Sequence, residues 1–187
     1  DNHRMAVGCI SAKDGQLASA IYMLDTHKNT VTAVYQADAG SALLDLKWIS
    51  NSQVLCIYDN FACVLNPSTG AELCRFSYGG AAVASVSVYG RTAALLLSTR
   101  SGSRLVVLND SMNALLDTTV AAANRVTVTH NSVYLLRDGT VERMNLKGES
   151  QWVQSFDTKP QFLLNAEQLL LFVDSSAQVL AAPAAEK

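Results

Sequence analysis

Cysteine offers the clearest opportunity for side-chain chemistry in this sequence. Cys56, Cys63 and Cys74 lie close together in the chain, while Cys9 lies near its start. Three neighbouring thiolates could bind a metal ion, and two neighbouring thiols could form a disulfide bond. No Cys-x-x-Cys motif and no Cys–His spacing typical of metal sites accompanies them. We therefore expect small, buried, free thiols, with a disulfide bond and a three-thiolate metal site as the alternatives.

The expected strands place these three cysteines in one row. A tight Asp-Asn turn between the first two makes Cys56 face Cys63. If Leu65 faces Glu72 across the next turn, Cys63 faces Cys74. Residues that face each other in this way have Cβ atoms about 4.5–5.5 Å apart. The sequence thus predicts a continuous row of three thiols across three strands.

The other residues that could do chemistry are scattered. His3, His27 and His130 share no motif, and each is expected to be solvated. No Gly-x-Ser-x-Gly elbow is present to support a nucleophilic serine. Several carboxylates fall in expected turns, where aspartate binds its own backbone; a ring of metal ligands is the alternative for Asp25, Asp59, Asp110, Asp138 and Asp174. The sequence therefore predicts no catalytic residue, no cofactor and no metal.

Composition excludes several classes of protein. The chain has 187 residues, of which 49% are hydrophobic and 16% charged, with a formal net charge of -2. It has no basic stripe to bind phosphates, so a nucleic-acid partner is not expected. No apolar run reaches the roughly 18 residues that a membrane-spanning helix needs. We expect no membrane contact by this segment itself.

One short pattern recurs along the chain at strand ends. An apolar residue or arginine, then leucine or methionine, precedes an expected turn five times, with the Leu/Met at residues 24, 65, 108, 144 and 180. The interval is about 40 residues, which is the length of a β-propeller blade. The pattern therefore predicts an all-β repeat protein of the propeller class.

The strands between these positions divide into blades. Expected blades cover residues 1–38, 41–80, 81–122, 124–158 and 160–183 of one propeller. The first has only its last three strands and the fifth only its first three, so about three complete four-stranded blades lie between two partial ones. We expect the chain to be part of a larger propeller of roughly seven or eight blades.

Two structural alternatives compete with this interpretation. Residues 114–123 are rich in alanine and leucine and could form a helix, but two threonines and a valine lie within them and favour a strand. A β-sandwich would also explain many short strands. It would not explain the five-fold recurrence at one interval.

Two segments resemble propeller repeats of the pyrroloquinoline-quinone type. Residues 59–73 combine a tight turn, a Val-Leu-Asn strand end and a Thr-Gly turn; residues 138–152 follow the same outline and end at Trp152. The resemblance is to repeat architecture and is closest to propellers of bacterial envelope proteins. It implies no cofactor-binding residue, because no motif for one is present, and no Trp-Asp dipeptide of the WD type occurs.

These observations lead to two functional hypotheses. The first is a non-catalytic propeller that serves as an interaction scaffold for a protein or glycan partner. The second is a cofactor- or substrate-binding propeller enzyme whose site lies partly in blades outside the chain. Its candidate polar groups lie on the expected inner strands: Asp45, Lys47, Ser85, Ser87, Thr127 and Thr129. From the resemblance we expect an extracytoplasmic protein, anchored to a membrane through a segment outside this chain.

Overall fold

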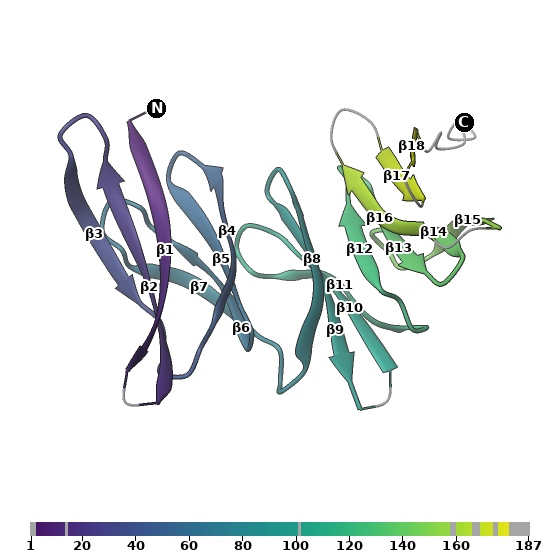
Figure 1. The fold of residues 1–187 in the computed structure, drawn as a ribbon, viewed down its shortest axis with the longest axis horizontal. Coiled ribbons are helices and arrows are strands. Elements are labelled where there is room, and N and C mark those ends of the chain that lie inside the picture. Colours follow the sequence, from purple (N-terminus) through teal and green to yellow (C-terminus); the bar gives the residue numbers. More distant parts are fainter. Residues whose placement is uncertain are drawn as a thin grey trace. The chain divides into compact units, whose positions relative to one another are not determined.

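The fold is built from β-strands alone in the part of the chain that is described. The computed structural model describes residues 3–13, 15–100, 102–157, 160–165, 169–173 and 176–179. These residues form 18 strands in five antiparallel sheets, and each strand pairs only with its neighbours in the sequence (Figure 1). The predicted order of one three-stranded, three four-stranded and one three-stranded sheet is confirmed.

The strands of each sheet follow one another in the chain. The first sheet contains β1 (Arg4–Lys13), β2 (Gln16–Asp25) and β3 (Thr30–Gln36). The second contains β4 (Leu43–Ser50), β5 (Gln53–Tyr58), β6 (Phe61–Leu65) and β7 (Glu72–Ser77). The third contains β8 (Ala82–Tyr89), β9 (Thr92–Thr99), β10 (Gly102–Leu108) and β11 (Ala114–Val120). The fourth contains β12 (Arg125–Val128), β13 (Ser132–Arg137), β14 (Thr140–Asn145) and β15 (Ser150–Ser155), and the fifth contains β16 (Pro160–Asn165), β17 (Leu169–Val173) and β18 (Ser176–Val179).

The chain divides into two compact units. The first contains Asp1–Ala82 and Asn109–Asn113, and the second contains Val83–Leu108 and Ala114–Lys187. In the first unit, apolar side chains of β2 pack with one face of β5 and β6, and their core is Ile21, Met23, Val54, Cys56, Tyr58, Phe61, Cys63 and Leu65. In the second unit, the third sheet packs with the fourth, and their core includes Leu96, Leu105, Val107, Val128, Val133 and Leu135.

The recurring strand-end pattern marks an irregularity in the sheets. Between the third and fourth strands of the second, third and fourth sheets the register shifts at Val64/Leu65, Val107/Leu108 and Arg143/Met144. The same shift occurs in the first sheet at Met23/Leu24. Each is a β-bulge, which places one extra residue in the last strand and bends it. Four of the five predicted strand ends thus carry the same local structure, and the fifth, at residues 179–181, lies mostly outside the described residues.

The residue after each bulge starts a turn held by its own side chain. The Oδ1 atoms of Asp25, Asn66, Asn109 and Asn145 each accept a backbone N–H from the residue two positions later, at 2.8–3.0 Å. The turns end with a residue of positive φ, such as Gly70 at 72°. A Cβ atom at Gly70 would lie 2.8 Å from the carbonyl oxygen of Val34, so this turn needs glycine for space as well as for conformation.

The segment that could have been helical is a strand. β11 pairs with β10 through residues 114–120, and this pairing satisfies backbone groups that a helix would have satisfied internally. Among the described residues, no helix combines the length and the apolar character that crossing a membrane requires.

Candidate functional site

The predicted row of three cysteines is half confirmed. Cys56 faces Cys63 across the turn that joins β5 and β6, as expected. Cys63, however, faces Arg75, and Cys74 faces Val64, so the prediction that Cys63 faces Cys74 is wrong. The cause is the bulge at the end of β6, which adds one residue to β7. A shift of one residue moves a side chain to the opposite face of a sheet.

The four cysteines are free thiols in different environments. Cys56 and Cys63 are buried, Cys74 is half-buried and Cys9 is exposed. Burial, and then the hydrogen bond with Cys63, raises the pKa of Cys56 far above its ordinary value. A buried neutral thiol is a poor nucleophile and a poor metal ligand. No group of three metal-binding side chains occurs among the described residues.

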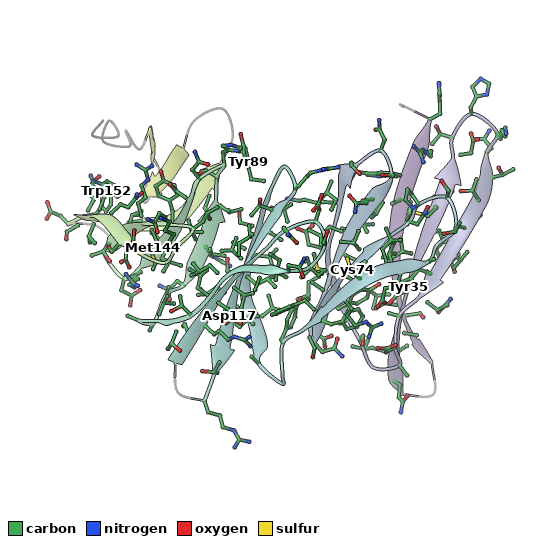
Figure 2. All side chains as sticks on the ribbon, turned by 180° about the vertical axis from the view of Figure 1, so that it is seen from behind. Tyr35, Cys74, Tyr89, Asp117, Met144 and Trp152 are labelled. Atoms are coloured by element: carbon green, nitrogen blue, oxygen red, sulfur yellow. The ribbon has the colours of Figure 1, made fainter. Side chains whose placement is uncertain are left out.

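Arg75 stands where the third thiol was expected and organises a polar cluster in the first unit. Its Nε and Nη2 donate to the two carboxylate oxygens of Glu72 at 2.8 and 2.7 Å. Its Nη1 pairs with Asp38, and its guanidinium carbon lies 3.9 Å from the centroid of the Phe61 ring. The Tyr35 hydroxyl, from β3, donates to Glu72 at 2.7 Å (Tyr35 is labelled in Figure 2). This Arg75 cluster therefore joins the last strands of the first and second sheets.

The electrostatics of the Arg75 cluster favour a structural role. Hydrogen bonds from Arg75 lower the pKa of Glu72, which stays ionised. Burial and the hydrogen bond to Glu72 raise the pKa of Tyr35 well above its usual range. The hydrogen bonds to Glu72 and Asp38 raise the pKa of Arg75. None of these shifts brings a group toward neutral pH, where a general acid or base works best.

The polar residues predicted on the inner strands are partly used by the backbone. Ser85 and Ser87 on β8 accept the backbone N–H groups of Val126 and Val128 on β12, at 3.1 and 3.0 Å. In this way β8 supplies hydrogen-bond acceptors to β12, the first strand of the neighbouring sheet. Thr129 donates its hydroxyl to the carbonyl of Ser132 at 3.2 Å.

The remaining inner-strand candidates divide between the two units. Thr127 is buried, with 3% exposure, in the second unit. In the first unit, Lys47 and Asp45 form an ion pair at 3.8 Å. Of the six candidates, Ser85, Ser87 and Thr129 thus bind backbone groups, and Asp45 and Lys47 pair with each other.

The predicted histidines are exposed as expected, and Asp25 binds the backbone of its own turn, whereas Asp59, Asp110 and Asp138 make other contacts. His3, His27 and His130 are exposed. Asp25 and Asp59 accept backbone N–H groups from His27 and Ala42, both at 3.0 Å. Asp138 instead accepts the side-chain amide of Asn124 at 2.8 Å, and Asp110 meets Cys74 through its backbone carbonyl, 3.9 Å from the sulfur. Asp174 lies outside the described residues.

A cationic and aromatic surface lies at one end of the first unit. Arg4 on β1 donates to the backbone carbonyl of Asn51 at 2.7 Å, and its guanidinium carbon lies 5.6 Å from the centroid of the Trp48 ring. The rings of His3 and His27 meet edge to face with centroids 5.4 Å apart. We call this surface the Arg4–Trp48 patch; its residues are His3, Arg4, His27, Lys28, Trp48 and Asn51.

The Arg4–Trp48 patch has the chemistry of an interaction surface. Trp48 is 38% exposed although it is a large aromatic residue, and Lys28 has a side chain that is 75% exposed. Asp25 lies 3.9 Å from the Lys28 ammonium and also accepts the backbone N–H groups of His27 and Lys28. Sequence reasoning missed the patch because Arg4 and Trp48 are far apart in the chain and meet only through the neighbouring strands β1 and β4.

Comparison with known proteins identifies the fold. No family model matches the chain, and no curated protein resembles it in sequence. The C-terminal WD40 domain of Sif2 matches with a TM-score of 0.67 and 13% identity, over 97% of this chain and 55% of that one. The Neurospora crassa Pan2 WD40 domain matches with a TM-score of 0.58 and 13% identity, over 87% and 57%. The computationally designed protein Ika8 matches with a TM-score of 0.65 and 14% identity, over 88% and 54%.

These similarities show a β-propeller fold. WD40 domains are propellers of four-stranded blades, and three of the sheets described in this chain are antiparallel and four-stranded. The chain spans 54–57% of the length of these three structures.

Proposed function

We propose that the chain is a non-catalytic propeller scaffold that binds a protein partner through the Arg4–Trp48 patch. One observation carries the proposal: Trp48 is 38% exposed, with the Arg4 guanidinium across its ring. Tryptophan and arginine are the residues that most often dominate the binding energy of protein interfaces. The hydrogen bond from Arg4 to Asn51 holds the arginine in place, which reduces the entropy that it would lose on binding.

The chemistry of the patch favours a partner with an acidic segment. Arg4 and Lys28 supply two positive charges against the one carboxylate of Asp25, which pairs with Lys28 at 3.9 Å. A carboxylate of the partner could pair with Arg4 while an apolar side chain covers Trp48. The WD40 neighbours support a scaffold role through their fold.

Partner capture tests this proposal. Tagged wild-type chain, Trp48→Ala and Tyr89→Ala are exposed to extracts of the cells that produce the protein, and bound proteins are quantified by mass spectrometry after crosslinking. Tyr89 is the matched control, since it is an exposed aromatic residue at 42% in the second unit. We expect one or more proteins to fall at least ten-fold with Trp48→Ala and to be retained by Tyr89→Ala.

Other outcomes of the capture experiment decide against the proposal. Equal capture by both variants would exclude the patch as the binding surface. Capture that disappears when glycans are removed from the extract would assign a glycan partner instead. Circular dichroism of each variant establishes that the fold is retained.

We propose in addition an extracytoplasmic location, with membrane attachment through a segment outside this chain. The support is the resemblance of residues 59–73 and 138–152 to repeats of envelope propellers. Protease added to intact cells should then degrade the protein after permeabilisation of an outer barrier but before lysis of the cytoplasm. Protection until the cytoplasm is lysed would contradict this location.

A further inference from the structure

The turn between β10 and β11 carries a sequence motif that a scaffold function does not require. Asn109-Asp110-Ser111 is an Asn-x-Ser triplet, which is the acceptor sequence for an N-linked glycan when x is not proline. The chain has one other Asn-x-Ser/Thr triplet, Asn66-Pro67-Ser68, in which proline prevents transfer of a glycan. Because the motif is short, the geometry of the turn decides what it can do.

The turn holds the Asn109 side chain through its oxygen atom. Oδ1 accepts the backbone N–H groups of Ser111 and Asn113, at 3.0 and 2.9 Å. The nitrogen of the same amide, Nδ2, makes no hydrogen bond among the described residues, and it is not a buried atom. Asn109 is half-buried, while Ser111 and Asn113 are exposed. The amide nitrogen is therefore held in one place and is open to solvent.

Two asparagines in other turns use this nitrogen to hold the fold. Nδ2 of Asn145 donates to Glu149 at 2.6 Å, and Nδ2 of Asn60 donates to Ser41 at 3.1 Å. A large substituent on either nitrogen would crowd one of these contacts. A substituent on Nδ2 of Asn109 displaces no hydrogen bond of the described fold, so Asn109 combines the acceptor motif with an available amide nitrogen.

We propose that Asn109 is the attachment site of an N-linked glycan. In the transfer, Nδ2 forms a bond with C1 of the first sugar of a lipid-linked diphosphate oligosaccharide. The bond between C1 and the diphosphate oxygen breaks, the lipid diphosphate leaves with the electron pair, and Nδ2 gives up one proton. Nothing is oxidised or reduced in this step.

This glycosylation site rests on the extracytoplasmic location proposed above, because the Asn-x-Ser motif is glycosylated in secreted proteins. It does not depend on the Arg4–Trp48 patch, with which it shares no residue. Either site can therefore fail without the other.

Peptide mapping of the protein purified from its own cells tests the proposal. Trypsin cleaves after Arg104 and Arg125, so residues 105–125 form one peptide that contains Asn109. Peptide-N-glycosidase in heavy-oxygen water converts each glycosylated asparagine into a heavy aspartate, which mass spectrometry locates. We expect at least half of the copies of this peptide to be marked at Asn109. Asn66 is the control and should be unmarked, since it starts the corresponding turn of the second sheet and accepts the N–H group of Ser68 at 2.8 Å.

Two variants of Ser111 separate glycosylation from other modifications of Asn109. Ser111→Ala removes the hydroxyl group that the motif requires, and Ser111→Thr keeps it. Both variants leave the backbone N–H of residue 111, which binds Asn109. We expect the marking of Asn109 to fall at least ten-fold with Ser111→Ala and to stay within two-fold with Ser111→Thr. Circular dichroism establishes that both variants are folded.

Three results would overturn the proposal. The first is an unmarked Asn109 in protein that added protease places outside the cytoplasm, which would leave the location intact. The second is an unmarked Asn109 in protein that is protected until the cytoplasm is lysed, which would contradict the location and the glycan together. The third is marking of Asn109 that Ser111→Ala leaves unchanged, which would assign a modification that does not depend on the motif.

Discussion

Two tyrosines of the first unit differ in the hydrogen bonding of their hydroxyl groups. The Tyr35 hydroxyl donates to Glu72, whereas the Tyr58 hydroxyl is buried and has no hydrogen-bond partner among the described residues. We predict that Tyr58→Phe leaves the free energy of unfolding unchanged or raises it by about 1 kcal/mol, because an unsatisfied polar group is removed. Tyr35→Phe should lower it by about 1 kcal/mol. Urea denaturation measures both.

The two tyrosine variants control each other, since each removes one oxygen atom from a ring that stays in place. A loss of more than 1 kcal/mol with Tyr58→Phe would show that its hydroxyl is bound in solution, for example by a buried water molecule. Equal effects of the two changes would contradict the different environments seen here.

The Arg75 cluster also predicts how stability depends on pH. Hydrogen bonds from Arg75 lower the pKa of Glu72, and hydrogen bonds from Arg104 lower that of Asp117. A lowered folded-state pKa gives stability that is present above the unfolded pKa, about 4, and is lost as pH falls through the folded value. We predict that the free energy of unfolding is flat from pH 7 to 5 and falls below pH 4.5.

Removing Arg75 or Arg104 should weaken the dependence of stability on pH. Because both carboxylates are partly exposed, each contributes on the order of 1 kcal/mol or less. Arg75→Gln should therefore flatten the fall below pH 4.5, and Arg104→Gln should do so by a similar amount. A slope that both variants leave intact would assign the acid sensitivity to other carboxylates.

The turn between β14 and β15 predicts how much one turn-forming asparagine contributes to stability. The Asn145 side chain accepts backbone N–H groups from Lys147 and Glu149, at 3.0 and 2.9 Å, between β14 and β15. Asn145→Ala should lower the free energy of unfolding by about 1 kcal/mol, as the loss of a helix-capping side chain does. Asn131→Ala, at an exposed residue before β13, is the control, and an equal effect there would contradict a special role for Asn145.

The contact between β8 and β12 is a second element to test. Ser85 supplies the oxygen that accepts the N–H group of Val126, a residue with 3% exposure. Ser85→Ala should cost about 1–3 kcal/mol because it withdraws this acceptor from a buried donor. Ser85→Thr keeps the hydroxyl and should cost less, and Ser98→Ala, at an exposed serine, should be neutral. If Ser85→Ala is also neutral, the hydroxyl does not hold the edge of β12.

Most of the β-strands were predictable from the sequence, because the signals for them lie in neighbouring residues. A short apolar run between turn residues defines β6, and two threonines and a valine favour a strand at β11, without any long-range information. The recurring strand-end pattern coincides with the bulges but does not by itself show that each adds a residue, such as Leu73 in β7, so Cys74 was predicted on the wrong face. Arg75 and the Arg4–Trp48 patch were missed for the related reason that both depend on contacts between sheets.

The reactivity of the four thiols should follow their burial in the folded protein. Cys9 should react with a thiol reagent at once, Cys74 more slowly, and Cys56 and Cys63 only when the first unit unfolds, because both are fully buried. Labelling in increasing urea should therefore show four reactive thiols after unfolding. Two missing thiols in the unfolded chain would mean a disulfide bond and would contradict the structure.

The number and order of the sheets were predictable from the five-fold recurrence, and the structure confirms them. The division into two compact units was not predictable, because it depends on how tightly particular sheets pack. The partner also lies beyond sequence reasoning, since the residues that we assign to it come together only after folding.

The pairing of each strand with its neighbours in the sequence also affects how the protein can fold during translation. Because each sheet is complete once its own strands have left the ribosome, the nascent polypeptide can fold one sheet at a time. At about 5–20 residues per second, translation takes on the order of 2–8 s for each segment of some 40 residues. Pairing within a sheet then protects its middle strands, while its two edge strands remain accessible until the neighbouring parts of the protein have formed.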